Sequence, residues 1–258
     1  SELRAPTSAL LPMGGAVFAL EVLLRGHDRR AALVPAVVSA VVATIVAGAF
    51  LGSDETYDFP LPSLTFGLCV VAIALGVCAV PIGIAFGWVM TRARTHAPHG
   101  WRAAILIPVA FTILGIVSIW VPDLLGNGKA LAQDAFSGSV SSAAAAGLVL
   151  LKPAATALCL RGGAIGGLLT PAFATGVALG VAAHAVPAAS HVSQVGGLAL
   201  LGAAAVLAVA QRAPWSAIAL TIEFTGAPFA LLLPIVLAVG AAKAVEHGAR
   251  HVAASRDR

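Results

Sequence analysis

Apolar residues dominate the chain in long runs that short polar connections separate. A membrane helix needs about 20 such residues, so most runs are long enough to cross or enter a bilayer. Segment 63–91 is long and contains Pro81, which predicts a tilted or kinked helix, whereas 213–225 is too short to span alone. We expect an all-α polytopic membrane protein. The apolar segments are 8–24, 31–52, 63–91, 101–121, 138–160, 164–186, 194–210, 213–225 and 228–247.

One boundary between these segments contains a run of glycines. Residues 161–171 read Arg-Gly-Gly-Ala-Ile-Gly-Gly-Leu-Leu-Thr-Pro. Glycine costs about 1 kcal/mol and proline about 3 kcal/mol relative to alanine inside a helix. In lipid, such a break persists only where it is buried in protein or lines a polar cavity. The helix that resumes over 172–185 would direct free N–H groups and a positive dipole end at this break, which predicts an anion site.

We expect the N–H groups of Leu168 and Leu169 to bind the anion, because amide donors attract it without holding it as a full charge would. The alternative is that the glycines only permit close helix packing. We prefer this second interpretation for two other pairs, Gly83 with Gly87 and Gly176 with Gly180. The predicted anion site comprises Gly166, Gly167, Leu168, Leu169 and Pro171.

The composition excludes an ordinary soluble domain. The chain is 59% hydrophobic and 10% charged, with a mean hydropathy of +0.97. No HExxH, GxSxG, Walker loop or pair of catalytic carboxylates occurs, so we expect no enzyme and no cofactor. His247 and His251 are spaced i, i+4, but nothing else converges on them and we expect no metal site.

The charges in the connections alternate in sign. Basic residues occur in 25–30, 92–102 and the C-terminal tail, and acidic residues occur in 53–61. The positive-inside rule then places the basic connections and the C-terminus on the cytoplasmic side of a bacterial inner or plasma membrane. The alternative is solvated loop charge without topological meaning. We attribute the net charge of +4 to topology and expect no nucleic-acid partner.

We expect 1–247 to form a single transmembrane domain and 248–258 a cytoplasmic tail. Trp88, Trp101 and Trp120 lie near segment ends, as interfacial anchors do.

Lys152, Glu21 and Glu223 are charged residues inside apolar segments, where ionisable residues are functional hypotheses by default. Lys152 either raises the positive potential of an anion path or extends to the membrane interface. Glu21 and Glu223 each follow a proline by nine residues, in Pro12–Glu21 and Pro214–Glu223, which is a weak sign of an internal repeat. We interpret both glutamates as buried, hydrogen-bonded structural acids.

Together these residues resemble the CLC family of chloride channels and chloride/proton antiporters. Gly167-Leu168-Leu169-Thr170-Pro171 resembles the family's anion motif Gly-x-Phe-x-Pro, with Leu169 in place of the phenylalanine. The segments 12–21 and 212–223 resemble the two repeat helices, and 122–128 resembles an outer-loop pattern. The resemblance covers nearly the whole chain in family order.

The resemblance implies the inverted-repeat architecture of that family, chloride or a similar anion as the transported ligand, and a homodimer with one pore per subunit. We expect the dimer surface on helices near 12–52 and 213–247. The family's first two anion motifs have no match here, so we expect the chain to be the last two thirds of a membrane domain. The pore tyrosine of the family also has no match, since the only tyrosine is Tyr57, in a predicted outer loop.

One departure from the family bears on mechanism. In proton-coupled members two consecutive glutamates end the first repeat helix and the second relays protons, whereas here Val22 follows Glu21. Valine cannot carry a proton. Channel members also tend to have valine there, which favours passive anion conduction. The alternatives are a chloride/proton antiporter with another proton route, a non-conducting membrane subunit, and a protein specialised for fluoride.

Overall fold

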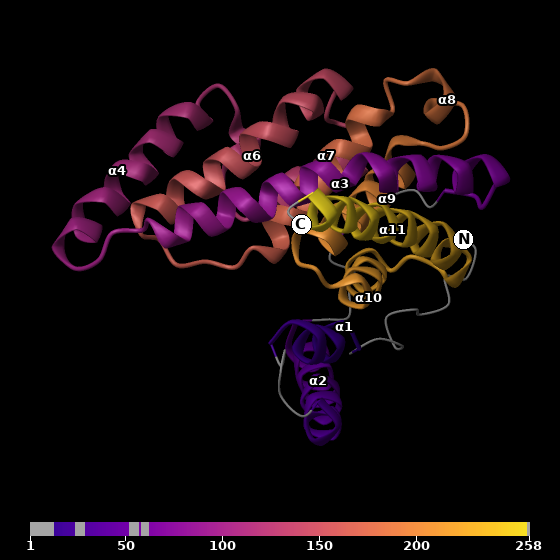
Figure 1. The fold of residues 1–258 in the computed structure, drawn as a ribbon, viewed down its shortest axis with the longest axis horizontal. Coiled ribbons are helices and arrows are strands. Elements are labelled where there is room, and N and C mark those ends of the chain that lie inside the picture. Colours follow the sequence, from indigo (N-terminus) through magenta and orange to yellow (C-terminus); the bar gives the residue numbers. More distant parts are fainter. Residues whose placement is uncertain (1–12, 24–28, 52–56, 58–61, 257–258) are drawn as a thin grey trace.

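The computed structural model describes residues 13–23, 29–51, 57 and 62–256, and every regular element within them is helical (Figure 1). The predicted all-α class is thereby confirmed. Pro12, most of the charged connections 25–30 and 53–61, and the last two residues of the predicted tail lie outside the described residues. The elements are α1 (Met13–Phe18), η2 (Ala19–Leu23), α2 (Arg29–Leu51), α3 (Phe66–Thr95), α4 (Trp101–Ser118), η3 (Pro122–Leu124), α5 (Lys129–Phe136), α6 (Ser142–Gly162), α7 (Leu169–Ala183), α8 (Pro187–Ser190), α9 (Val195–Ala210), α10 (Pro214–Thr225), η4 (Phe229–Leu231) and α11 (Leu232–Arg256).

Five helices of the described chain are long and apolar enough to cross a membrane, and α7 and α9 are shorter apolar helices. Pro81 lies inside α3, which continues over 30 residues from Phe66 to Thr95. Helix α11 continues to Arg256, into the stretch predicted as a tail. The short helices α5 and α8 are not among the predicted segments, because both are too short to form a long apolar run. The spanning helices are contained in Ala31–Phe50, Phe66–Thr95, Trp101–Ser118, Ser142–Gly162 and Phe229–Arg250.

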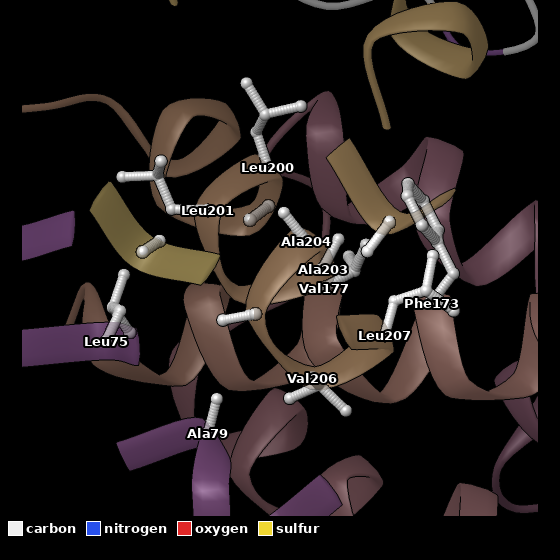
Figure 2. Close-up of a cluster of buried hydrophobic side chains, with 14 of the residues drawn as sticks. Leu75, Ala79, Phe173, Val177, Leu200, Leu201, Ala203, Ala204, Val206 and Leu207 are labelled. Carbon is white, nitrogen blue, oxygen red and sulfur yellow. The ribbon is translucent and has the colours of Figure 1, made fainter. Parts of the chain in front are cut away.

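Helix α9 is the centre of the fold. Every residue from Gly196 to Val209 is buried, and α3, α7, α10 and α11 all pack against it. Figure 2 shows the core that results, with side chains from α3, α7 and α9 interleaved. Glycines bring α7 and α9 into backbone contact, since a Cβ on Gly180 would lie 2.0 Å from the Leu198 carbonyl oxygen. Small residues permit this close approach, as in other membrane helix pairs.

Tyr57 lies in this core rather than at the surface of a loop. Its side chain is 1% exposed, and its ring stacks on Phe173 of α7 with centroids 5.5 Å apart. Phe136 and Phe224 complete the aromatic cluster, and the Tyr57 N–H donates to the Phe224 carbonyl at 2.9 Å. Burial raises the pKa of Tyr57 to about 12. The sequence position between two apolar segments does not reveal this inward placement.

Helix α1 lies beside α10, and α2 packs on α1 and extends away from the rest of the molecule (Figure 1). None of the most apolar part of α2 is buried, and large apolar side chains such as Val34 and Phe50 are exposed. A helix of this kind is covered by lipid or by another protein surface.

Candidate anion site

The predicted break lies between α6 and α7, at residues 163–168. Helix α6 ends on Gly163, whose φ of 106° is left-handed. The Gly163 N–H donates to the Leu160 carbonyl and the Ala164 N–H to the Cys159 carbonyl, each at 3.0 Å. This is the usual glycine termination of a helix, and it explains the first glycine of the run.

The start of α7 leaves backbone donors open. The Ala172 N–H donates to the Leu168 carbonyl at 3.1 Å, and Pro171 has no N–H to donate. Within the described residues, the N–H groups of Leu168, Leu169 and Thr170 have no hydrogen-bond acceptor, and no side chain caps the helix. Free N–H groups at the positive end of a helix dipole are the elements from which anion sites are built.

The two glycines before this helix start are not packing residues. A Cβ built on Gly166 or Gly167 meets no heavy atom within 4 Å among the described residues, and both glycines are exposed. By contrast, a Cβ on Gly83 would approach Val209 to 2.6 Å, and Gly176 and Gly180 lie against the backbone of α9. Close helix packing therefore accounts for these three glycines but not for Gly166 and Gly167.

Two arginines fix the neighbourhood of the break. Arg94, at the end of α3, donates to the Gly166 carbonyl at 2.9 Å, and Arg161, at the end of α6, donates to the His96 carbonyl. Sequence reasoning missed both contacts. Arg161 directly precedes the glycine run and could have been found from that position, but no local signal connects Arg94 with a residue 72 positions away.

Lys152 is buried, with 1% of the residue exposed, and its ammonium group donates hydrogen bonds to backbone carbonyls. Its Nζ donates to the carbonyl oxygens of Asp123, Leu124, Leu125 and Gly126 at 3.0–3.2 Å. The lysine thus joins the middle of α6 to the loop before α5. It lies ten residues, or about 15 Å of helix, before Gly162. A contribution of its charge to an anion path stays a prediction.

The carboxylates of Glu21 and Glu223 each accept hydrogen bonds from the start of the other repeat helix. The Glu21 carboxylate accepts from the N–H of Ser216 at 2.6 Å, from its hydroxyl at 2.6 Å and from the N–H of Trp215 at 3.3 Å, at the start of α10. The Glu223 carboxylate, near the end of α10, accepts from the Gly14 N–H at 2.9 Å, at the start of α1. Each acid caps the other helix, which supports their interpretation as hydrogen-bonded structural acids, but both are half-buried and not buried as predicted, because each lies at a helix end.

The other predicted positions are placed as follows. Val22 lies in the π-helical turn η2 beside Glu21 and is half-buried. Ser216 is a further partner that sequence reasoning missed, although its position directly after Pro214 and Trp215 is typical of a helix start. Residues 166–171 form one continuous stretch at the break, and Lys152 and the two glutamates bond elsewhere.

Comparison with known proteins now adds to this geometry. The sequence family described as "Voltage gated chloride channel" matches residues 11–247. The chain belongs to the voltage-gated chloride channel family. This membership confirms the CLC resemblance and establishes an integral membrane protein.

Its relatives include both channels and exchangers by name. The chain is 32% identical over 238 residues to a "Putative chloride channel protein ClcB-like" of Ralstonia nicotianae, covering 88% of this chain and 54% of the relative. It is 28% identical over 239 residues to an "H(+)/Cl(-) exchange transporter ClcA" of Vibrio parahaemolyticus, covering 88% of this chain and 50% of the relative. The chain therefore spans about half the length of the curated relatives that it matches.

Two solved structures share the fold. A CLC-type fluoride/proton antiporter matches with a TM-score of 0.71 at 24% identity, covering 91% of this chain and 58% of the other. A slow cyanobacterial Cl⁻/H⁺ antiporter matches with a TM-score of 0.73 at 21% identity, covering 91% and 57%. These likenesses confirm the CLC-type architecture.

Proposed function

We propose that this protein moves chloride or a similar small anion across a bacterial inner membrane, with the backbone N–H groups of Leu168 and Leu169 as anion ligands. The observation that carries the proposal is the open helix start at residue 169, beside two glycines at which an added Cβ would meet no described atom within 4 Å. Amide dipoles lower the free energy of a dehydrated anion without binding it so firmly that it cannot leave. The family membership supports an anion as the transported species.

Passive conduction is the mode that the residues of this chain favour. Val22 stands beside Glu21 and has no titratable group, so a proton cannot pass through that position. Coupled exchange is the second candidate, because several of the relatives and both solved structures are named as proton-coupled exchangers or antiporters. Proton coupling would then need a route that avoids Val22.

The proposed assembly is a homodimer whose surface includes α2, and the proposed topology places the 92–102 connection and the C-terminus in the cytoplasm. The exposed apolar surface of α2 supports the first proposal. The arginines of the 92–102 connection support the second by the positive-inside rule. Cysteine crosslinking across α2 tests the dimer, and a failure to crosslink at any exposed position would contradict it.

Flux from liposomes tests the function and its mode together. The full-length protein is reconstituted, and a chloride electrode and a pH electrode are read in the same experiment. The proposal expects chloride efflux with no proton movement against its gradient. Efflux that drives protons uphill would establish the antiporter, and absence of any anion flux would establish a non-conducting subunit. Replacement of chloride by fluoride in the same vesicles measures specialisation for that ion.

A further inference from the structure

A cluster of basic side chains lies where α3 and α6 end and α4 begins. Two open pockets meet there, of about 630 and 500 Å³, and His96 and Arg161 line both. The residues that line either pocket include no acidic side chain. Among the described residues that line the pockets, no carboxylate balances the arginine charges, so the site is suited to an anionic ligand. The basic lining residues are Arg92, His96, His99, Arg102 and Arg161.

The arginines of this site lie against tryptophans. The Arg92 guanidinium carbon is 5.9 Å from the ring centroid of Trp88, and that of Arg102 is 5.8 Å from Trp101. The two indoles are 63% and 71% exposed. Exposed tryptophans at the ends of membrane helices mark the level of the lipid head groups. The pockets therefore open at the boundary between membrane and water.

An apolar surface continues from the pocket along α4. Only 6% of this helix is buried, and Leu106 of α4 is part of the pocket lining. Further along, the side chains of Val109 and Phe111 are exposed. A soluble anion would leave this apolar surface uncovered. A phospholipid matches both parts, since its phosphate is opposite in charge to the arginines and its acyl chains are apolar like the exposed surface of α4.

We propose that this site, which we call the basic pocket, binds the head group of an anionic phospholipid between α3, α4 and α6. Basic pockets between membrane helices are known to recognise such head groups. Arginine suits the task because its planar donors match phosphate oxygens and its face stays on an aromatic ring. Arg92 and Arg102 would make the phosphate contacts, whereas Arg161 already donates to the His96 carbonyl. The proposal does not depend on anion transport.

Tryptophan fluorescence tests the proposal on the full-length protein in nanodiscs. Trp120→Phe and Trp215→Phe restrict the emission of this chain to Trp88 and Trp101, since the sequence has four tryptophans; tryptophans elsewhere in the full-length protein are replaced likewise. Brominated phosphatidylglycerol is then titrated against brominated phosphatidylcholine. We expect phosphatidylglycerol to quench preferentially, and R92Q/R102Q to reduce its relative binding constant by about fivefold for each arginine. The control is Lys129→Gln, an exposed lysine beyond the far end of α4, which should change the constant less than twofold.

Three results would overturn the proposal. The first is equal quenching by the two lipids in the unmodified site. The second is an effect of R92Q/R102Q no larger than that of Lys129→Gln. The third is complete loss of the preference when millimolar inorganic phosphate is added, which would assign the pocket to a soluble anion. The quenching is read without any flux measurement, so its failure is distinguishable from a failure of the transport proposal.

Discussion

Helix α7 and the turn before it carry glycines in two regions with opposite surroundings. Gly176 and Gly180 lie inside the helix, where a Cβ would meet the α9 backbone at 2.4 Å and 2.0 Å. Gly166 and Gly167 lie just before the helix, where a Cβ would meet none of the described atoms within 4 Å. The first pair joins two helices, and the second pair leaves backbone accessible.

The difference shows that a glycine pair in an apolar sequence has two distinct uses. Close packing buries the glycine and satisfies its N–H inside the helix. An open helix start leaves N–H groups for a ligand. The same contrast separates two helix starts of this chain, because Glu21 caps α10 whereas no side chain of the described residues caps α7. Substitutions at these positions therefore have effects of very different size.

The largest effect is expected from Gly180→Val. Its side chain would overlap the Leu198 carbonyl, and the α7–α9 contact cannot widen without disturbing the core. We expect a loss of about 3 kcal/mol in the free energy of unfolding, measured by denaturant titration in detergent. The control is Gly240→Val in α11, where a Cβ meets none of the described atoms within 4 Å. Equal losses for the two variants would remove the distinction between packed and open glycines.

The next effect is expected from Lys152→Met, which removes the donor that four loop carbonyls share. We expect a loss of about 2 kcal/mol and faster hydrogen exchange in residues 122–128. Because the hydrogen bonds of the Lys152 ammonium go only to carbonyls of residues 123–126 and not to the break, exchange at 163–168 should stay unchanged. The control is Lys129→Met on the exposed surface. Faster exchange at the break instead would indicate that Lys152 acts on the anion site.

A smaller effect is expected from Glu21→Ala, which opens the start of α10 as the start of α7 is open. The lost cap should cost about 1 kcal/mol, read as a lower denaturation midpoint. Asp134→Ala changes an exposed acid of α5 and should cost less than about 0.5 kcal/mol. If the two variants were equally stable, the reciprocal caps would contribute nothing to the fold.

The smallest effect on stability is expected from Gly166→Ala and Gly167→Ala. Both positions have room for a methyl group, so the free energy of unfolding should change by less than about 0.5 kcal/mol. Thermal unfolding of the two variants beside Gly180→Val measures this directly. A loss as large as that of Gly180→Val would mean that Gly166 and Gly167 are packed against other atoms. That result would contradict the description of both glycines as open.

Much of this architecture is predictable from the sequence, because apolar runs of membrane length force helices. The break is predictable too, since glycine and proline cannot continue a helix cheaply. The inward position of Tyr57 and the contact of Arg94 with Gly166 are not, because both depend on tertiary neighbours far away in sequence. The acceptors of Lys152 are not predictable either, because a single charged residue in an apolar sequence does not indicate which carbonyls it will contact.

The most direct test of the anion site removes the Leu169 N–H group and leaves every side chain in place. An ester replaces the amide of Leu169 in the full-length protein, and chloride binding is measured by calorimetry. The account predicts a Kd about tenfold or more higher, which corresponds to one hydrogen bond to a charged ligand. The same ester at Leu179, inside α7, should leave the Kd within twofold. An unchanged Kd at Leu169, or an equal change at both positions, would contradict the account.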